Sequence, residues 1–155
     1  MKDFNSDEYF MAKALELARQ ALEEREVPVG AILVFENKII AKGYNQVEKL
    51  KDATAHAEMV CISAASNHFD SWRLEDAILY TTLEPCVMCA GAIMAARIKK
   101  LVWGAPDLRL GANGSWVDIF AQKHPFHSIE ITKNILMEES ADLMREFFKG
   151  RRNSF

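Results

Sequence analysis

The feature that most restricts the fold is a pair of short motifs that place metal-binding side chains on two separate segments. His56 and Glu58 form a His-x-Glu motif, and about thirty residues later Cys86 and Cys89 form a Pro-Cys-x-x-Cys motif. Each motif follows a loop or a strand and begins an expected helix, with Thr54 as the cap of the first. A fold that uses both motifs must therefore bring two helix N-termini together at one edge of a sheet.

The side chains of these motifs favour a catalytic zinc site. One imidazole and two thiols are typical zinc ligands, and the partial positive charge of a helix N-terminus favours the thiolate form that a metal needs. A structural zinc site has four protein ligands, whereas a catalytic site keeps one position open for water. Three ligands are at hand, His56, Cys86 and Cys89. We expect Glu58 to lie beside the metal and to transfer protons.

Other interpretations of the thiols remain open. By itself, Cys-x-x-Cys also occurs as a redox pair or as half of a structural zinc site. Cys61 lies five residues after His56, on another side of the same expected helix, which favours buried packing over a fourth ligand.

Length, charge and cysteine content narrow the class of protein. The 155 residues suffice for one domain with a hydrophobic core, and we expect a single domain over 1–155. The formal net charge of −3 argues against a broad electrostatic grip on nucleic acid but allows a local basic patch. An odd number of cysteines, three, fits a reducing compartment. Without an apolar leader or a membrane-spanning run, we expect a cytoplasmic protein that makes no membrane contact.

Apolar patterns predict an alternating series of helices and strands. The first expected helix includes the apolar positions of 11–22 and ends near 24–26, and the others cover 55–66, 86–97 and 138–149. The expected strands cover 29–35, 39–41, 77–83, 100–105 and 129–132, and 46–52 is an expected loop. This order is typical of an α/β protein in which helices cover both faces of a mixed five-stranded sheet, a three-layer α/β/α sandwich.

The two motifs together resemble the signature of the zinc-dependent nucleoside and base deaminases. Further stretches resemble the bacterial tRNA-specific adenosine deaminases in particular, and the resemblance extends from about residue 8 to 152. These stretches are Glu24-Arg25-Glu26-Val27-Pro28-Val29-Gly30-Ala31, Gly43-Tyr44-Asn45, Thr82-Leu83-Glu84-Pro85-Cys86-Val87-Met88-Cys89-Ala90-Gly91-Ala92 and Gly111-Ala112-x-Gly114-Ser115.

The resemblance implies a cytidine deaminase-like fold and a reaction. The reaction is hydrolytic deamination of adenosine to inosine at the wobble position of a tRNA anticodon, in that family an arginine tRNA. His56, Cys86 and Cys89 would hold one zinc per subunit. Glu58 would take a proton from the attacking water, deliver it to ring N1 and later help ammonia to leave.

The resemblance also implies substrate-binding residues and a homodimer. Asn45 matches a position that hydrogen-bonds the target nucleotide, Val29 matches a wall against the base, and Asp107 matches a loop that meets the flanking nucleotides. The residues around Asp107 depart from the Arg-Asp-x-Lys-x pattern that we associate with the family. Phe148, Arg151 and Arg152 match a C-terminal helix, about 138–152, that grips the anticodon stem-loop.

Two other functions compete with this one. A deaminase of free guanine, cytidine or deoxycytidylate would use the same chemistry but has less use for a basic C-terminal helix. A non-catalytic RNA-binding module stabilised by zinc would need a fourth protein ligand and would leave Glu58 without a role.

Overall fold

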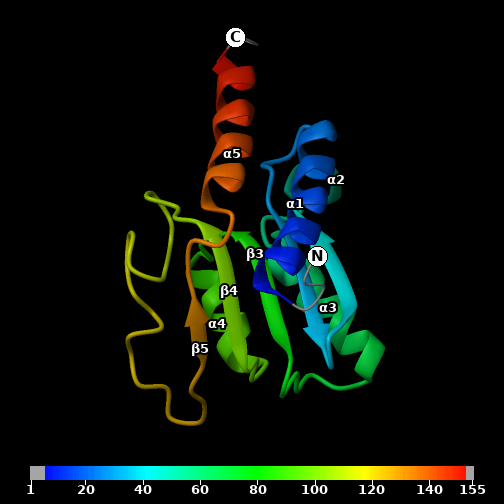
Figure 1. Ribbon diagram of the computed structural model, residues 1–155, viewed down its shortest axis with the longest axis vertical. Helices are drawn as coiled ribbons and strands as arrows, with labels where there is room; N and C mark the ends of the chain where they lie inside the picture. Colours follow the sequence, from blue (N-terminus) through cyan, green and yellow to red (C-terminus); the bar gives the residue numbers. More distant parts are fainter. Residues whose placement is uncertain (1–5, 153–155) are drawn as a thin grey trace.

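A mixed five-stranded sheet forms the middle layer of the computed structural model, which describes residues 6–152 and, for Arg152, the backbone alone (Figure 1). The strand order is β2-β1-β3-β4-β5; β1 is antiparallel to β2 and β3, whereas β3, β4 and β5 run parallel. The strands are β1 (Gly30–Phe35), β2 (Lys38–Tyr44), β3 (Ile78–Leu83), β4 (Lys100–Ala105) and β5 (Glu130–Thr132). The predicted α/β/α sandwich is confirmed.

The helices form a layer on each face of the sheet. α1 and α5 contact each other and pack on β3 and β4, whereas α3 packs on β1 and β2 from the other side and contacts α4 (Figure 1). The bounds are α1 (Asp7–Glu23), α2 (Val47–Leu50), α3 (Ala57–Phe69), α4 (Val87–Ala95) and α5 (Met137–Arg152).

Strand β1 shows why the sheet is buried on both sides. Ala31 and Leu33 pack into the core under α3 and α4, whereas Ile32 and Val34 pack into the core under α1. Successive side chains of a strand point to opposite faces, so a strand covered on both faces needs an unbroken apolar run rather than alternation.

Gly43 sets the distance between β2 and α3. A Cβ at this position would lie 2.5 Å from the carbonyl oxygen of Ala57 and 2.7 Å from the amide nitrogen of Cys61. Because such separations are shorter than a van der Waals contact, any larger residue would push the first turn of α3, which carries Glu58, away from the sheet.

The expected loop at 46–52 contains the four-residue helix α2, which sequence periodicity did not predict. The N-cap residue, Gln46, makes no side-chain capping bond. The buried carboxylate of Glu26 accepts hydrogen bonds from the amides of Glu48 (3.0 Å) and Lys49 (2.8 Å) instead. A partner more than twenty residues away stabilises this short helix, so a local pattern could not indicate it.

Among residues 6–152, no helix combines the length and apolarity that a membrane crossing requires.

Candidate active site

His56 and Cys86 occupy equivalent positions at the starts of two helices. His56 is the N-cap of α3 and Cys86 is the N-cap of α4, both with extended backbone, and neither side chain caps its own helix. The expected cap, Thr54, lies in the preceding turn, where its hydroxyl donates to Asp52 (2.7 Å). The imidazole and the thiol therefore project free of their helices.

The nitrogen and sulfur donors converge at a spacing that fits zinc. The Nδ1 atom of His56 lies 3.5 Å from Sγ of Cys86 and 3.6 Å from Sγ of Cys89. Tetrahedral bonds of about 2.0 Å to nitrogen and about 2.3 Å to sulfur would separate these atoms by roughly 3.6 Å. Within residues 6–152, these three residues form the cluster whose potential ligand atoms all lie within 4.8 Å of one another. Cys61 is buried elsewhere under the sheet.

The contact between the two thiols shifts their pKa values in opposite directions. The thiol of Cys89, followed by the imidazole of His56, stabilises the Cys86 thiolate and lowers the pKa of Cys86 to about 4. The same contact with Cys86 raises the pKa of Cys89, and the Cys86 thiolate raises the pKa of His56. A divalent cation here would favour ionisation of both thiols, because coordination deprotonates a thiol.

Glu58 lies next to the donor cluster but outside it. It is in the first turn of α3 and is only 4% exposed. Loss of hydration on burial raises the pKa of this carboxyl. A raised pKa makes a carboxylate a stronger base, which suits a group that takes a proton from one atom and returns it to another.

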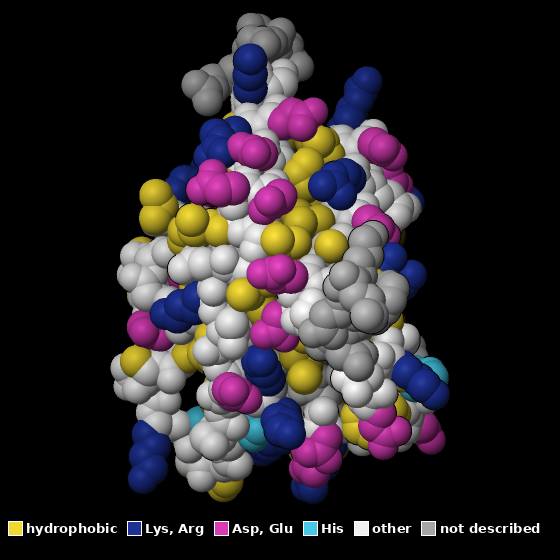
Figure 2. All heavy atoms as spheres, in the orientation of Figure 1, with side chains coloured by type: hydrophobic (Ala, Val, Ile, Leu, Met, Phe, Trp, Pro, Cys, Tyr) yellow, Lys and Arg dark blue, Asp and Glu magenta, His cyan; other side chains and the backbone are white. Residues whose placement is uncertain are grey.

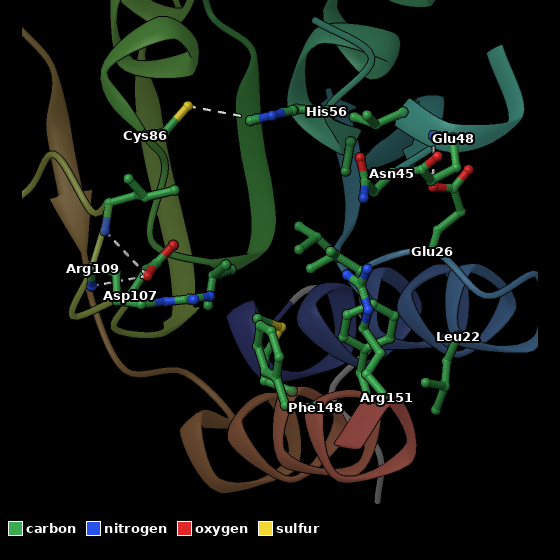
Figure 3. Close-up of a pocket in the computed structure, with 18 of the residues that line it drawn as sticks. Leu22, Glu26, Asn45, Glu48, His56, Cys86, Asp107, Arg109, Phe148 and Arg151 are labelled. Carbon is green, nitrogen blue, oxygen red and sulfur yellow. Dashed lines mark hydrogen bonds between the residues drawn. The ribbon is translucent and has the colours of Figure 1, made fainter. Parts of the chain in front are cut away.

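One cavity of about 890 Å³ adjoins the donor cluster and extends to the C-terminal helix (Figure 3). Of the residues predicted from the sequence, those that line it are Val29, Asn45, His56, Glu58, Cys86, Asp107, Phe148 and Arg151. Cys89 is buried and is not among the lining residues, and the side chain of Arg152 lies outside what the structure describes.

Asn45 offers the cavity an unused hydrogen-bond acceptor. Its side chain is 7% exposed, and its Oδ1 atom has no hydrogen-bond partner. A buried polar atom without a partner costs on the order of 1–3 kcal/mol, so a ligand that donates to it would gain a strong directional contact. Val29 forms an apolar part of the wall nearby, since its amide nitrogen and carbonyl oxygen are used by backbone bonds to Val27 and Asn45.

Residues that received no role from the sequence complete the walls. Arg109 places its guanidinium 4.8 Å from the centre of the Phe148 ring, so loop 106–115 and α5 meet across the cavity (Figure 3). Asp107 accepts from the amides of Arg109 (3.2 Å) and Leu110 (3.3 Å), which shapes the turn that carries Arg109. Glu26 and Glu84 are buried acids that also line the cavity. Glu84 stands between Leu83 and Pro85. An acid in such an apolar segment is a usable sequence signal, because a buried acid needs hydrogen-bond donors.

Comparisons with known proteins identify the family of this chain. Residues 4–105 match the family described as the cytidine and deoxycytidylate deaminase zinc-binding region. The chain is 40% identical to a tRNA-specific adenosine deaminase of Bacillus subtilis over 94% of its own length and 91% of the relative's. It is 51% identical to a chloroplastic tRNA(adenine(34)) deaminase of Arabidopsis thaliana, again over 94% of its length, but it spans only 12% of that longer protein.

Solved structures show the same fold with similar sequences. A structure from a study of A-to-I editing by tRNA:A34 deaminases has a TM-score of 0.84 and 44% identity over 87% of this chain and 98% of its own. A guanine deaminase from Nitrosomonas europaea has a TM-score of 0.77 and 26% identity over 92% of this chain and 84% of its own. The chain therefore belongs to the zinc-binding cytidine and deoxycytidylate deaminase family and, within it, to the tRNA-specific adenosine deaminases.

Proposed function

We propose that this protein deaminates adenosine to inosine at the wobble position of a tRNA anticodon, with an arginine tRNA as the substrate that its family suggests. The observation that supports this most directly is a cavity lined together by His56 and Cys86 of the donor cluster, by Glu58 and Asn45, and by the aromatic and basic side chains of α5. A free-base enzyme has no evident use for Phe148 and Arg151 on such a wall.

In this proposal, His56, Cys86 and Cys89 hold one zinc ion per subunit. Bound zinc supplies Lewis-acid chemistry by lowering the pKa of water to about 7. Three protein donors are the number typical of catalytic zinc sites, so the ion would supply this chemistry beside Glu58.

Glu58 carries the protons of the reaction. Water adds to C6 of adenine, and Glu58 takes one of its protons and delivers it to ring N1. A second proton passes through Glu58 to the amino group, the C6–N6 bond breaks, and ammonia leaves with inosine as the product. The burial that raises the pKa of Glu58 suits a group that must accept and donate in turn.

Asn45 and Val29 position the extruded nucleotide. Oδ1 of Asn45 accepts a hydrogen bond from it, and Val29 packs against the base. Enzymes that act on a base take it out of the stack and read it in a fitted pocket, so a cavity with one apolar wall and one free acceptor suits this substrate.

Loop 106–115 and α5 grip the RNA around the target. Asp107 meets the flanking nucleotides, the Phe148 ring stacks on a base, and Arg151 and Arg152 contact phosphates of the anticodon stem-loop. On the face shown in Figure 2, basic and acidic side chains are interspersed and form no broad basic field, in keeping with the net charge of −3.

The test is a parallel assay of RNA and free compounds. The purified zinc-loaded protein is incubated with an anticodon stem-loop that has adenosine at the wobble position, and separately with adenosine, cytidine and guanine. Nuclease digestion and mass spectrometry should find inosine from the stem-loop alone. A stem-loop with its adenosine moved into the paired stem is the matched control. Conversion of a free compound without inosine in the RNA would favour the free-base alternative.

The exposed face of α4 supports a homodimer. Val87, Gly91 and Ala95 recur every four residues and are exposed, although this helix is apolar throughout. A buried helix partner would explain an apolar face with small side chains. Size-exclusion chromatography with light scattering should give twice the 17.6 kDa chain mass, and Ala95→Glu should give the monomer. We also propose that the protein is cytoplasmic and that 1–155 is one domain.

A further inference from the structure

Glu84 is a buried acid that holds the loop on one wall of the active-site cavity. It follows β3, is 2% exposed and precedes Pro85 and Cys86. Its Oε1 atom accepts from the amide of Asp107 (3.2 Å) and from the hydroxyl of Ser115. Its Oε2 atom accepts from the amides of Asn113 (2.8 Å) and Ser115 (3.3 Å). One side chain thus satisfies four donors of a single loop.

The loop is built around this carboxylate. A Cβ at position 111 would overlap the carboxylate atoms of Glu84, so the glycine there leaves the space that the acid fills. The amide of Ala112 also donates to the carbonyl oxygen of Pro85 (2.8 Å). These contacts fasten loop 106–115 to the segment immediately before Cys86.

The loop's outer turn forms the cavity wall. Asp107, Arg109 and Leu110 line the cavity, and Arg109 reaches Phe148 on α5. Arg109 and Leu110 are exposed, as is Leu108, so the apolar side chains of this turn are not buried in the core. Its position depends on the amide of Asp107, which Glu84 holds.

We propose that Glu84 is a positioning residue that fixes loop 106–115 against the substrate, an inference that rests on the proposed RNA deaminase function. Both side-chain oxygens of Glu84 must act as hydrogen-bond acceptors. A glutamine in its place would turn an NH₂ group toward a backbone N–H in either amide orientation, because both carboxylate oxygens face backbone amides. The donors would be left without partners, and the loop would detach from the end of β3.

The first experiment measures how firmly loop 106–115 is held, in the absence of substrate. Arg109 is an exposed trypsin site, so limited digestion followed by mass spectrometry measures cleavage after it. We expect Glu84→Gln to raise this cleavage rate about ten-fold or more. Tyr80→Phe is the matched control: it removes a hydrogen bond to Asp7 (2.7 Å) on the α1 side and should leave cleavage after Arg109 unchanged. Equal rates in Glu84→Gln and wild type would overturn the proposal.

The second experiment separates positioning from chemistry. With the anticodon stem-loop, Glu84→Gln should raise KM about ten-fold or more, keep kcat within about three-fold and keep the wild-type zinc content, because the hydrogen bonds of Glu84 go to Asp107, Asn113 and Ser115 of the loop. Tyr80→Phe should change neither constant. A fall in kcat with unchanged KM, or loss of zinc, would show that Glu84 acts on the metal centre and would contradict the proposal.

Two further variants change the loop residues that contact Glu84. Gly111→Ala should reproduce the faster cleavage and the higher KM, because its methyl group displaces the carboxylate. Ser115→Ala removes a single hydroxyl donor and should shift both readouts in the same direction by less. If Glu84→Gln does not fold, Gly111→Ala and Ser115→Ala test the positioning role of Glu84 in its place. If the wild-type protein deaminates no RNA, the proposed function fails, while the cleavage rates still test the role of Glu84.

Discussion

Glu58 and Asn45 show how burial prepares single side chains for chemistry. Glu58 has a raised pKa because it is almost completely removed from water, and the donor cluster does not include it. Asn45 keeps a buried oxygen without a partner. Each feature is unfavourable for folding, and such groups gather at sites that interact with a ligand.

Replacing Glu58 with glutamine should separate catalysis from binding. The amide has nearly the same shape but cannot carry protons, so we expect kcat to fall by about 10²–10⁴-fold or more. Zinc content, measured by metal analysis, and stem-loop affinity, measured by fluorescence anisotropy, should stay near wild type. If the variant keeps its turnover, Glu58 is not the proton carrier and the mechanism is wrong.

Replacing Asn45 with alanine should lower activity without lowering the stability of the fold. Removing the unpartnered oxygen relieves a desolvation cost, so the free energy of unfolding in urea should stay within about 1 kcal/mol of wild type or rise. The lost contact to the nucleotide should lower kcat/KM about ten-fold or more. A parallel loss of both quantities would mean that Asn45 supports the fold and does not contact the substrate.

At the scale of elements, α5 presents different side chains to the cavity and to solvent. Phe148 and Arg151 line the cavity, whereas Arg145 pairs with Glu138 and Asp142 on the exposed side. Arg145 and Arg151 of this helix thus lie in different environments, and only Arg151 of the two lines the cavity beside the donor cluster.

This division predicts unequal effects of two arginine substitutions on α5. Arg151→Ala should weaken stem-loop binding and reduce the slope of log K against log salt concentration by about 1, because one phosphate contact is lost. Arg145→Ala is the matched control and should change neither value. The measurement is fluorescence anisotropy over a series of salt concentrations, and equal effects of the two variants would contradict the assignment.

At the scale of the whole molecule, the donor cluster joins two helices that start from different parts of the sheet. α3 follows β2 and the short helix α2, whereas α4 follows β3, and His56, Cys86 and Cys89 link their starts. A metal bound there ties the segments together and stabilises the folded chain by mass action.

Chelation of the metal should therefore lower stability as well as abolish activity. We expect the unfolding temperature, measured by circular dichroism, to fall on the order of 5–10 °C. Iodoacetamide should label Cys86, which is partly exposed, after chelation and much less before it, whereas Cys61 is 0% exposed and should stay unlabelled throughout. Labelling of Cys86 at the same rate with and without chelator would argue against it as a ligand.

The main elements could be predicted from the chain alone because their signals are local. Apolar runs indicated all five strands, and three- and four-residue periodicity indicated α1 and α5. The starts of α3 and α4 differ from expectation because His56 and Cys86 take the extended conformation of a cap, so the helices begin one residue after them. α2 was missed because its stabilising partner, Glu26, is distant in sequence.

The sequence by itself determined the ligand types, the adjacent acid and the family, because each depends on the identity and spacing of a few neighbouring residues. Only the tertiary structure decided what Glu84 and Arg109 contact. The donors to Glu84 lie 23 to 31 residues away, and Phe148 lies far beyond Arg109 in the chain. A carboxylate's partners are fixed by which loop the packed sheet brings to it, and no local pattern carries that information.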